Sequence, residues 1–400
     1  MHNRRLDILN FFLADVRGGL GAFVSVFLLT QAHWTAGEIG AVLTISGLIG
    51  ITAHTPIGAL IDMTRSKRAM LVVGVMVLAV CAVAIERSPI GPVVLSADIA
   101  MAVLGAVFAP TIAAISLGVV GPKRFPGRVA RNVAFDRLGN VFMAALVGVV
   151  GWYFSQHAIF YLVPFFAFLS AFVVLSIPAH AIDHDVARGF TAATAKRLPE
   201  DWRTMLRERK PLLLLALSVA AFHFAGATML PLAGQKLALE HPGFETLLLS
   251  ACILVAQLGM IPMALLVGAR ADRWGRKPLF VIACAALVAR GFIFCQFDSA
   301  LVLVGAQVLD GISGGILDIL VPLMLADIMR GSGRYSVSRG VVGTVQGVGG
   351  SLSNVAGGTL VVVGGYNFAF AALALAAACA LCLVIVRMPE TGRLSMKGAA

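Results

Sequence analysis

The stretch GARADRWGRKP, residues 268–278, has a counterpart in GALIDMTRSKR, residues 58–68, which lies 210 positions earlier in the chain. Each stretch follows a long apolar run, begins with glycine and carries aspartate at its fifth position. A second pair of residues recurs at almost the same offset, because Arg131 and Arg339 are 208 positions apart and each opens a glycine-rich apolar run. This agreement predicts that the chain is a duplication of two similar halves.

The composition is that of a membrane protein. Of the 400 residues, 59% are hydrophobic and 13% are charged, and the mean hydropathy is +0.92. A soluble domain has about 45–50% apolar and about 25% charged residues. Apolar runs recur from Leu6 to Met388 and leave no room for a soluble domain. The first run is too long for a cleavable leader and no A-x-A site follows it, so we expect it to remain as a membrane helix.

We therefore predict an all-α membrane protein with twelve transmembrane helices in two pseudo-symmetric six-helix bundles. The expected bundles are residues 1–178 and 211–400, and the hydrophilic segment 179–210 is expected to be a cytoplasmic linker between them. Each span is an apolar run that suits a hydrocarbon core of about 30 Å. The spans are expected near residues 8–30, 37–61, 69–86, 93–118, 132–153, 158–178, 211–233, 245–267, 278–296, 299–328, 340–362 and 367–387.

The net charge of +11, from 31 Lys and Arg against 20 Asp and Glu, is unevenly distributed. Most basic residues lie in the termini and in every second loop, whereas the alternate loops contain only Arg87 and Lys236. By the positive-inside rule, both termini and the central linker are expected on the cytoplasmic side of a bacterial-type inner membrane. The positive charge is thus a topology signal, and nucleic-acid binding is not expected.

No pattern in the chain indicates an enzyme or a metal protein. All six cysteines lie inside predicted spans, so no disulfide framework is expected. Cys379 and Cys382 have C-x-x-C spacing, but without a second ligand pair they are better explained as packing residues. We expect no metal and no cofactor, with a proton gradient as the energy source. The expected partners are a small-molecule substrate, protons and the lipid bilayer, and the expected state is a monomer.

The chain resembles the major facilitator superfamily over its whole length. Residues 268–278 match that family's G-x-x-x-D-R-x-G-R-K/R loop motif at every defined position, between the eighth and ninth predicted spans. The first copy has Met63 and Arg65 in place of the motif's arginine and glycine. The motif positions are Gly58, Asp62, Lys67 and Arg68 in the first half, and Gly268, Asp272, Arg273, Gly275, Arg276 and Lys277 in the second.

The resemblance implies that the motif is a cytoplasmic gate, which closes that face while the cavity is open outward. Physically, Gly268 would let two helices approach closely, and Asp272 could cap the N–H groups of the helix that follows. The basic residues could bridge to carboxylates or lipid phosphates. A loop that obeys only the positive-inside rule is the alternative interpretation.

Asp15 and Arg17 lie in the first apolar run, about 14 Å and 17 Å into the membrane core if the helix starts near Leu6. A charge at that depth costs on the order of 2.5–3.5 kcal/mol, so each side chain should face protein or a water-filled cavity. The two point roughly 200° apart around the helix and need separate partners.

The repeat offset relates Asp15 to His223 in the seventh span. In the resemblance, spans 1, 4, 7 and 10 line a central cavity, so these two residues would face one another. A carboxylate and an imidazole can take up and release protons in the physiological range, which makes them candidates for proton coupling. The alternative is that Asp15 bonds a neighbouring helix and His223 is a satisfied core histidine.

The tenth span adds Asp310 and Asp318, which are eight positions apart and share a broad helix face. Such a track could bind a cation or relay a proton. Arg290 in the ninth span lies at a depth similar to that of Asp310, so a structural ion pair is predicted between them. Asp318 is therefore the stronger functional candidate.

The fifth span carries G-x8-G from Gly139 to Gly148, part of the pattern of the family's drug–proton antiporter branch, which the chain resembles most. The G-P dipeptide expected next is absent, and Met101 stands where that branch has arginine. We predict a secondary transporter that exports a small amphiphilic compound by alternating access, coupled to protons. The runner-up is a proton-coupled importer, or an exporter of an anionic metabolite with Arg17 as counter-ion; a non-transporting membrane sensor is a further alternative.

Overall fold

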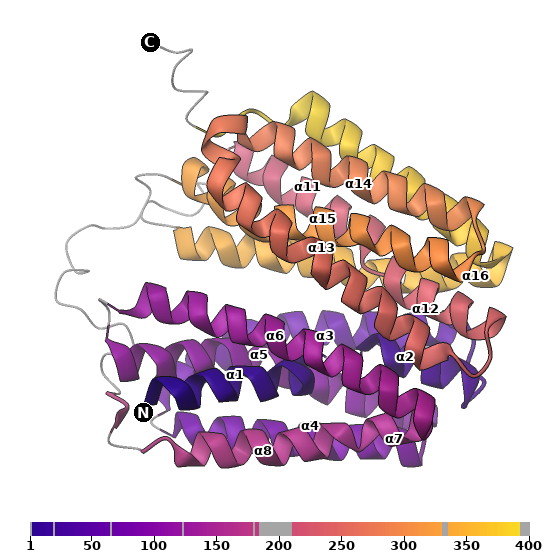
Figure 1. Ribbon diagram of the computed structural model, residues 1–400. Coiled ribbons are helices and arrows are strands. Elements are labelled where there is room, and N and C mark those ends of the chain that lie inside the picture. The colour runs from indigo at the N-terminus through magenta and orange to yellow at the C-terminus, as the bar shows by residue number, and fades with distance from the viewer. Residues whose placement is uncertain are drawn as a thin grey trace, which may run out of the picture. The chain divides into compact units, whose positions relative to one another are not determined.

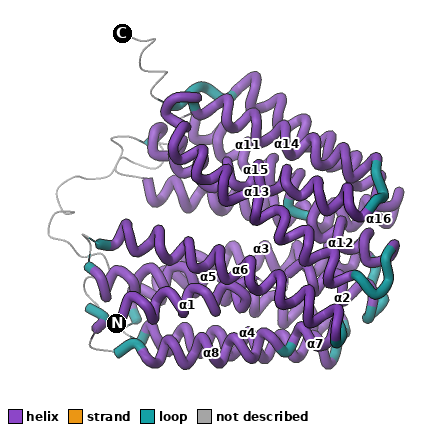
Figure 2. Tube along the Cα trace, viewed as in Figure 1, coloured by secondary structure: helices purple, strands orange, loops and turns teal. Residues whose placement is uncertain are grey.

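The computed structural model describes residues 2–18, 21–64, 66–121, 124–178, 181–183, 210–329 and 335–392. Side chains are described in these ranges except at 2, 15–18, 54–55, 58–59, 62–63, 126 and 335–337. In the described ranges all regular secondary structure is helical (Figures 1 and 2), which confirms the predicted all-α architecture.

The chain folds into two compact units. Unit 1 contains Met1–His33, Ile45–Lys196 and His241–Ser250, and unit 2 contains Trp34–Thr44, Arg197–Glu240 and Ala251–Ala400. Unit 1 holds the helices α1 (His2–Gly18), α2 (Gly21–Thr30), most of α3 (Ala36–Met63), α4 (Lys67–Arg87), α5 (Gly91–Val120), α6 (Phe125–Tyr153), α7 (Gln156–Phe160) and α8 (Leu162–Ser176). Unit 2 holds α11 (Lys210–Gly226), α12 (Met229–Glu240), most of α13 (Glu245–Trp274), α14 (Arg276–Gln296), α15 (Ala300–Ile328) and α16 (Tyr335–Arg387).

Each unit includes a short segment from the other half of the sequence. The start of α3 belongs to unit 2, where the hydroxyl of Thr44 donates to the carbonyl of Ser351 at 2.7 Å and accepts from the N–H of Val355 at 3.0 Å. The start of α13 belongs to unit 1, where a Cβ at Gly148 of α6 would meet the side chain of Ser250. The two halves therefore exchange one helix end each.

Ten helical segments of the described chain are long and apolar enough to cross a membrane. The predicted count of twelve differs from this in two places. The expected first span falls on α1 and α2, on either side of residues 19–20, which lie outside the described residues. The expected eleventh and twelfth spans both lie in α16, which has 53 residues and one non-helical position at Gly365, with φ 81° and ψ 177°. Only glycine adopts such a conformation readily, so α16 is broken there.

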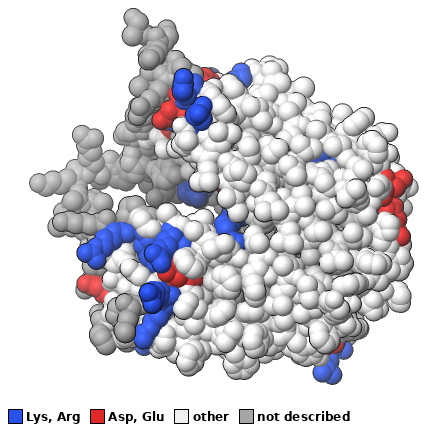
Figure 3. All heavy atoms as spheres, in the orientation of Figure 1, with Lys and Arg blue, Asp and Glu red and all other residues white. Residues whose placement is uncertain are grey.

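The surface suits a lipid environment. Large apolar side chains point outward along the helices, among them Phe172 at 73% and Leu301 at 83% exposure. On the face drawn in Figure 3, most of the surface of each unit carries no Asp, Glu, Lys or Arg, and most visible Lys and Arg of unit 1 gather at the end that carries the N-terminus. The chain is thus a multi-pass membrane protein, because so much exposed apolar surface is unusual in water.

Candidate functional site

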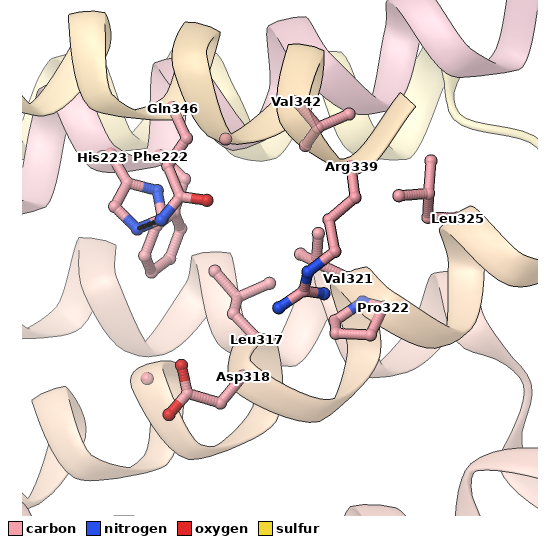
Figure 4. Close-up of a pocket in the computed structure, with 12 residues that line it drawn as sticks. Phe222, His223, Leu317, Asp318, Val321, Pro322, Leu325, Arg339, Val342 and Gln346 are labelled. Atoms are coloured by element: carbon pink, nitrogen blue, oxygen red, sulfur yellow. Dashed lines mark hydrogen bonds between the residues drawn. The ribbon is translucent and has the colours of Figure 1, made fainter. Parts of the chain in front are cut away.

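A cavity of about 230 Å³ lies inside unit 2, between α11, α15 and α16 (Figure 4). Its polar lining consists of His223, Asp318, Arg339 and Gln346, and the rest of the lining is mainly apolar. Figure 4 shows His223 beside Gln346 at one end, while the Arg339 side chain extends from α16 toward the part of α15 that carries Asp318.

Helical periodicity places these residues on common faces. On α15, Gly314, Leu317, Asp318, Val321, Pro322 and Leu325 line the cavity, and on α16 Arg339, Val342, Gly343 and Gln346 do so. Both sets follow the i, i+3, i+4, i+7 pattern of one helix face. Each helix therefore presents a mixed stripe to the cavity, apolar with one or two polar positions.

His223 is held by two hydrogen bonds. Its Nδ1 lies 2.9 Å from the carbonyl oxygen of Val219, one turn earlier in α11, and its Nε2 lies 3.0 Å from Nε2 of Gln346 on α16. A carbonyl oxygen can only accept, so Nδ1 carries the proton of the neutral ring. The unprotonated Nε2 then accepts from the amide of Gln346. Both ring nitrogens are satisfied in this neutral form.

Arg290 and Asp310 form an ion pair between α14 and α15. Arg290 is 1% exposed, and its Nη2 also donates to the carbonyl of Gly226 at 3.1 Å. Asp310 is not among the residues that line the cavity, whereas Asp318, two turns further along α15, is exposed and does line it. The two aspartates of α15 therefore have different surroundings, because Asp310 pairs with Arg290 and Asp318 lines the cavity.

Asp15 and Arg17 belong to α1, but their side chains lie outside the described residues. The predicted approach of Asp15 to His223 therefore remains a prediction. The two residues also belong to different units.

The second copy of the loop motif surrounds the start of α14. Arg276 is 4% exposed; its Nη2 donates to Asp272 at 2.7 Å and its Nε donates to Asp327 at 3.0 Å. The N-cap residue Gly275 has φ +88°, a conformation that explains the glycine of the motif. Arg273 is exposed and Lys277 is partly exposed at the same end.

At two positions of the motif the structure shows contacts other than those suggested by the sequence. The first N–H groups of α14 are not capped by Asp272; those of Arg276 and Lys277 donate to the carboxylate of Glu390 at 2.8 and 3.1 Å. Asp272 pairs with a guanidinium instead. A Cβ at Gly268 would meet nothing within 4 Å among the described residues, so this structure contains no close helix contact there.

In the first copy of the motif, the surroundings of Gly58 and the side chain of Asp62 lie outside what the structure describes. Lys67 is fully buried, and its ammonium group donates to the carbonyls of Ile61 at 3.1 Å and Thr64 at 2.8 Å. Arg68 donates to the carbonyl of Ile177 at 2.6 Å. These bonds tie the end of α3 and the end of α8 to the start of α4.

The glycines of the G-x8-G pattern are contact positions within unit 1. A Cβ at Gly139 would collide with the carbonyl of Phe11 on α1, and a Cβ at Gly148 would collide with Ser250. The pattern therefore permits close packing of α6 against two other helices.

Comparison with known proteins decides the family. A family model described as the Major Facilitator Superfamily matches residues 6–262 and 247–399. The protein belongs to the Major Facilitator Superfamily. The predicted superfamily resemblance is therefore confirmed, and the chain is an MFS transporter by family; the drug–proton antiporter branch stays a prediction.

Its relatives in this superfamily include two uncharacterised MFS-type transporters from Mycobacterium tuberculosis, of strains CDC 1551 / Oshkosh and ATCC 25618 / H37Rv. Each is 44% identical over 392 residues, covering 97% of this chain and 93% of the relative. Crystal structures of the nucleoside transporter NupG share the fold. The structure of a NupG mutant has a TM-score of 0.81 at 13% sequence identity, and the match covers 96% of this chain and 99% of the NupG chain. A second NupG structure has a TM-score of 0.76 at 14% identity, and the match covers 96% of this chain and 97% of the NupG chain.

Sequence reasoning missed several residues of this superfamily member that the structure makes prominent. In the sequence, Gln346 is one of several polar residues in the apolar runs whose role stays open, and Arg339 is only a mark of the repeat. The i, i+7 spacing from Arg339 to Gln346 was the signal that could have placed both on one face. Glu390 offered no local signal, because its partner Arg276 is 114 positions away.

Proposed function

We propose that this superfamily transporter moves a small solute across the membrane by alternating access and couples that movement to protons at the His223 cavity. The supporting observation is that both ring nitrogens of His223 are hydrogen-bonded in a cavity that also contains Asp318, Arg339 and Gln346. An imidazole is the side chain best suited to change charge near neutral pH.

Protonation would reverse one hydrogen bond and leave the other intact. The Nδ1–H of His223 already donates to Val219, so the added proton must go to Nε2. Nε2 would then be a donor and would face the N–H groups of the Gln346 amide. Gln346 would have to turn its amide so that the oxygen accepts, or lose the hydrogen bond between α11 and α16.

Because protonation reverses the hydrogen bond between His223 and Gln346, it can shift the equilibrium between two conformations of the transporter. A ligand shifts a conformational equilibrium only by its differential affinity for the two states. A proton on His223 would favour whichever state lets Gln346 present its oxygen, and it would be drawn toward Asp318 on the opposite wall of the cavity. Asp15 in unit 1 remains the proposed second proton site, and Asp310 is proposed to position Arg290.

For the solute, a small amphiphilic compound that is exported is our first proposal. The cavity combines apolar walls, formed by Phe222, Leu317 and Val321, with the Asp318 carboxylate. This combination suits a molecule with an apolar body and a cationic or hydrogen-bonding group.

An anionic metabolite is the second candidate, and Arg339 is the observation that favours it. Its guanidinium lines the same cavity and can bind a carboxylate or phosphate by two parallel hydrogen bonds. Arg17 is the proposed counter-ion in unit 1 for this alternative. In either case we place the protein in a bacterial-type inner membrane with both termini in the cytoplasm, because of its basic loops.

The test is transport in proteoliposomes that contain the purified protein and an internal pH-sensitive dye. A fluorescent amphiphilic cation and a radiolabelled dicarboxylate are supplied as alternative solutes, with and without an imposed pH gradient. Solute flux that depends on the gradient, with a matching internal pH change, is expected for the wild type. His223→Ala and Asp318→Asn should lower the gradient-driven flux at least tenfold.

The control is His241→Ala, which makes the same substitution in the α12–α13 connection, at a residue that does not line the cavity. It should transport like the wild type. If the flux of His223→Ala and Asp318→Asn still responds to the pH gradient as the wild type does, proton coupling at this cavity is wrong. Which of the two solutes moves decides between the two substrate proposals.

A further inference from the structure

A second cavity, of about 370 Å³, lies in unit 1 at the starts of α1 and α6 and the end of α5. Arg124, Arg128 and Arg131 line it, and none of its described lining residues is acidic. We propose that this cavity binds the phosphate group of an anionic ligand at the membrane surface.

One arginine of the cavity is rigidly held. The guanidinium of Arg128, which is 3% exposed, donates to Asp7 at 2.5 Å, to Asn132 at 2.8 Å and to the carbonyl of Asn3 at 3.1 Å. These bonds fix its position on the inner wall. Arg128 is therefore the pre-organised part of the site, with little conformational entropy left to lose on binding.

The positive charge of the cavity is only partly neutralised. Asp7 is 3% exposed, and it also accepts a two-fold bond from Arg131, at 2.9 Å to Nε and 2.7 Å to Nη2. One carboxylate thus serves two guanidinium groups. Arg124 adds a third guanidinium group to the cavity. This group is exposed and makes no side-chain hydrogen bond or ion pair with any described residue.

The local chemistry favours phosphate over other ligands. The net charge of the three arginines and Asp7 is +2, which suits an anion with more than one charged oxygen. Guanidinium groups match phosphate oxygens by parallel hydrogen bonds. The helix α6 starts beside the cavity with no acidic residue in its first turn and no capping side chain, so its positive end adds to the attraction.

The position of the cavity makes two sources of phosphate possible. It lies at the N-terminal end of unit 1, where basic side chains gather in Figure 3 and which the positive-inside rule assigns to the cytoplasm. Both lipid headgroups and soluble phosphate reach this level. Either ligand would be held by the same arginines, and it would link α6 to α1 through Arg128 and Asn3.

The charge test uses the full-length protein, purified in detergent and stripped of lipid. Phosphatidylglycerol is titrated and counted by native mass spectrometry, and inorganic phosphate is titrated in a thermal-unfolding assay. The double variant Arg124→Gln/Arg131→Gln leaves the buried Arg128–Asp7 pair intact. Near a membrane surface each basic residue changes affinity for an anion by about fivefold, so the double variant should bind about 25-fold more weakly.

The control Arg387→Gln removes one exposed cation at the end of α16 and should bind both probes as the wild type does.

A steric variant tests the cavity without altering charge. Gly127 lines the cavity and a Cβ there would meet nothing within 4 Å, so Gly127→Leu should fold normally and fill the space. It should weaken binding at least tenfold.

Weaker binding of phosphatidylglycerol by both cavity variants identifies a lipid headgroup as the ligand. Weaker binding of inorganic phosphate identifies a soluble anion. If the double variant and Gly127→Leu bind both probes as tightly as Arg387→Gln does, or if the wild type binds neither probe, the cavity is not a phosphate site and the proposal is overturned.

Discussion

The imidazole of His223 and the amide of Gln346 lie 3.0 Å apart and join α11 to α16. Replacing Gln346 by glutamate would put a carboxylate beside Nε2 and stabilise the imidazolium form of the ring. An opposite charge at hydrogen-bond distance shifts such an equilibrium by about 1–3 pH units. We expect the pH of half-maximal gradient-driven flux in proteoliposomes to rise by that amount in Gln346→Glu.

The comparison variant for this prediction is Gln346→Leu, which has no acceptor for a protonated Nε2. Its flux profile should move toward lower pH, opposite to that of Gln346→Glu. Profiles with the same midpoint in the wild type and both variants would show that this hydrogen bond does not sense the proton.

The ion pair between Arg290 and Asp310 should be structural. In Asp310→Leu the guanidinium, which is 1% exposed, would stay buried without its carboxylate, so we expect a loss of about 3–5 kcal/mol of folding stability. The double variant Arg290→Met/Asp310→Leu removes both charges and should recover most of that loss. Thermal unfolding of the detergent-purified variants measures this difference.

Transport by the same double variant separates the roles of the two aspartates of α15. If the pair only supports the fold, the double variant should retain gradient-driven flux, whereas Asp318→Asn should lose flux with a stability change of about 0.5 kcal/mol or less. A well-folded double variant without flux would place Arg290 and Asp310 in the transport mechanism.

Glu390 should stabilise the start of α14. Its two carboxylate oxygens accept from the N–H groups of Arg276 and Lys277 at the positive end of the helix. Glu390→Ala removes both bonds and should cost about 1–2 kcal/mol of stability, the range of a lost N-cap. Glu390→Gln keeps one acceptor oxygen and should cost less, and equal unfolding midpoints for all three proteins would rule out a capping role.

The fold could be predicted from sequence because apolar run length, loop charge and the motif are local signals. The helix count could not be settled in the same way. Gly365 is one of several glycines in an apolar region, and nothing in the local sequence marks it as the one with a positive φ. The pairing of Arg290 with Asp310 could be predicted only because the depth of each residue in the membrane can be counted along its helix.

The cavity lined by His223 was harder to predict from the sequence. His223 was identified from the repeat, but Gln346 was one of four polar residues, with Gln257, Gln307 and Asn354, that could bind substrate or join helices. Which of them approaches His223 depends on how α13, α15 and α16 are rotated about their axes, which the sequence does not specify. The capping by Glu390 depends on a contact over 114 positions and follows from tertiary packing alone.

The contact between Lys236 and Asp298 predicts an acid-sensitive stability. Lys236 is 3% exposed, and its ammonium group lies 2.5 Å from the carboxylate of Asp298, which belongs to the loop between α14 and α15. The hydrogen bond and charge of Lys236 lower the pKa of Asp298 below its ordinary value of 3.8. A lowered carboxyl pKa stabilises the folded state above the unfolded-state value, near pH 4, and this contribution disappears as the pH falls through the lower folded-state value.

Asp298→Asn should therefore unfold at a lower temperature than the wild type at pH 7. Because the Asp298 side chain is 66% exposed, this difference should be small. It should shrink as the pH is lowered below about 4, because the wild-type carboxylate then becomes protonated and loses its attraction for Lys236. Thermal unfolding from pH 7 to pH 3 measures the trend. Asn367→Ala is the uncharged comparison, because it removes an amide acceptor of Lys236 at 2.7 Å and a donor to Asp298 at 3.5 Å but leaves the carboxylate in place. A difference between wild type and Asp298→Asn that stays constant over this range would mean that the carboxylate charge contributes nothing.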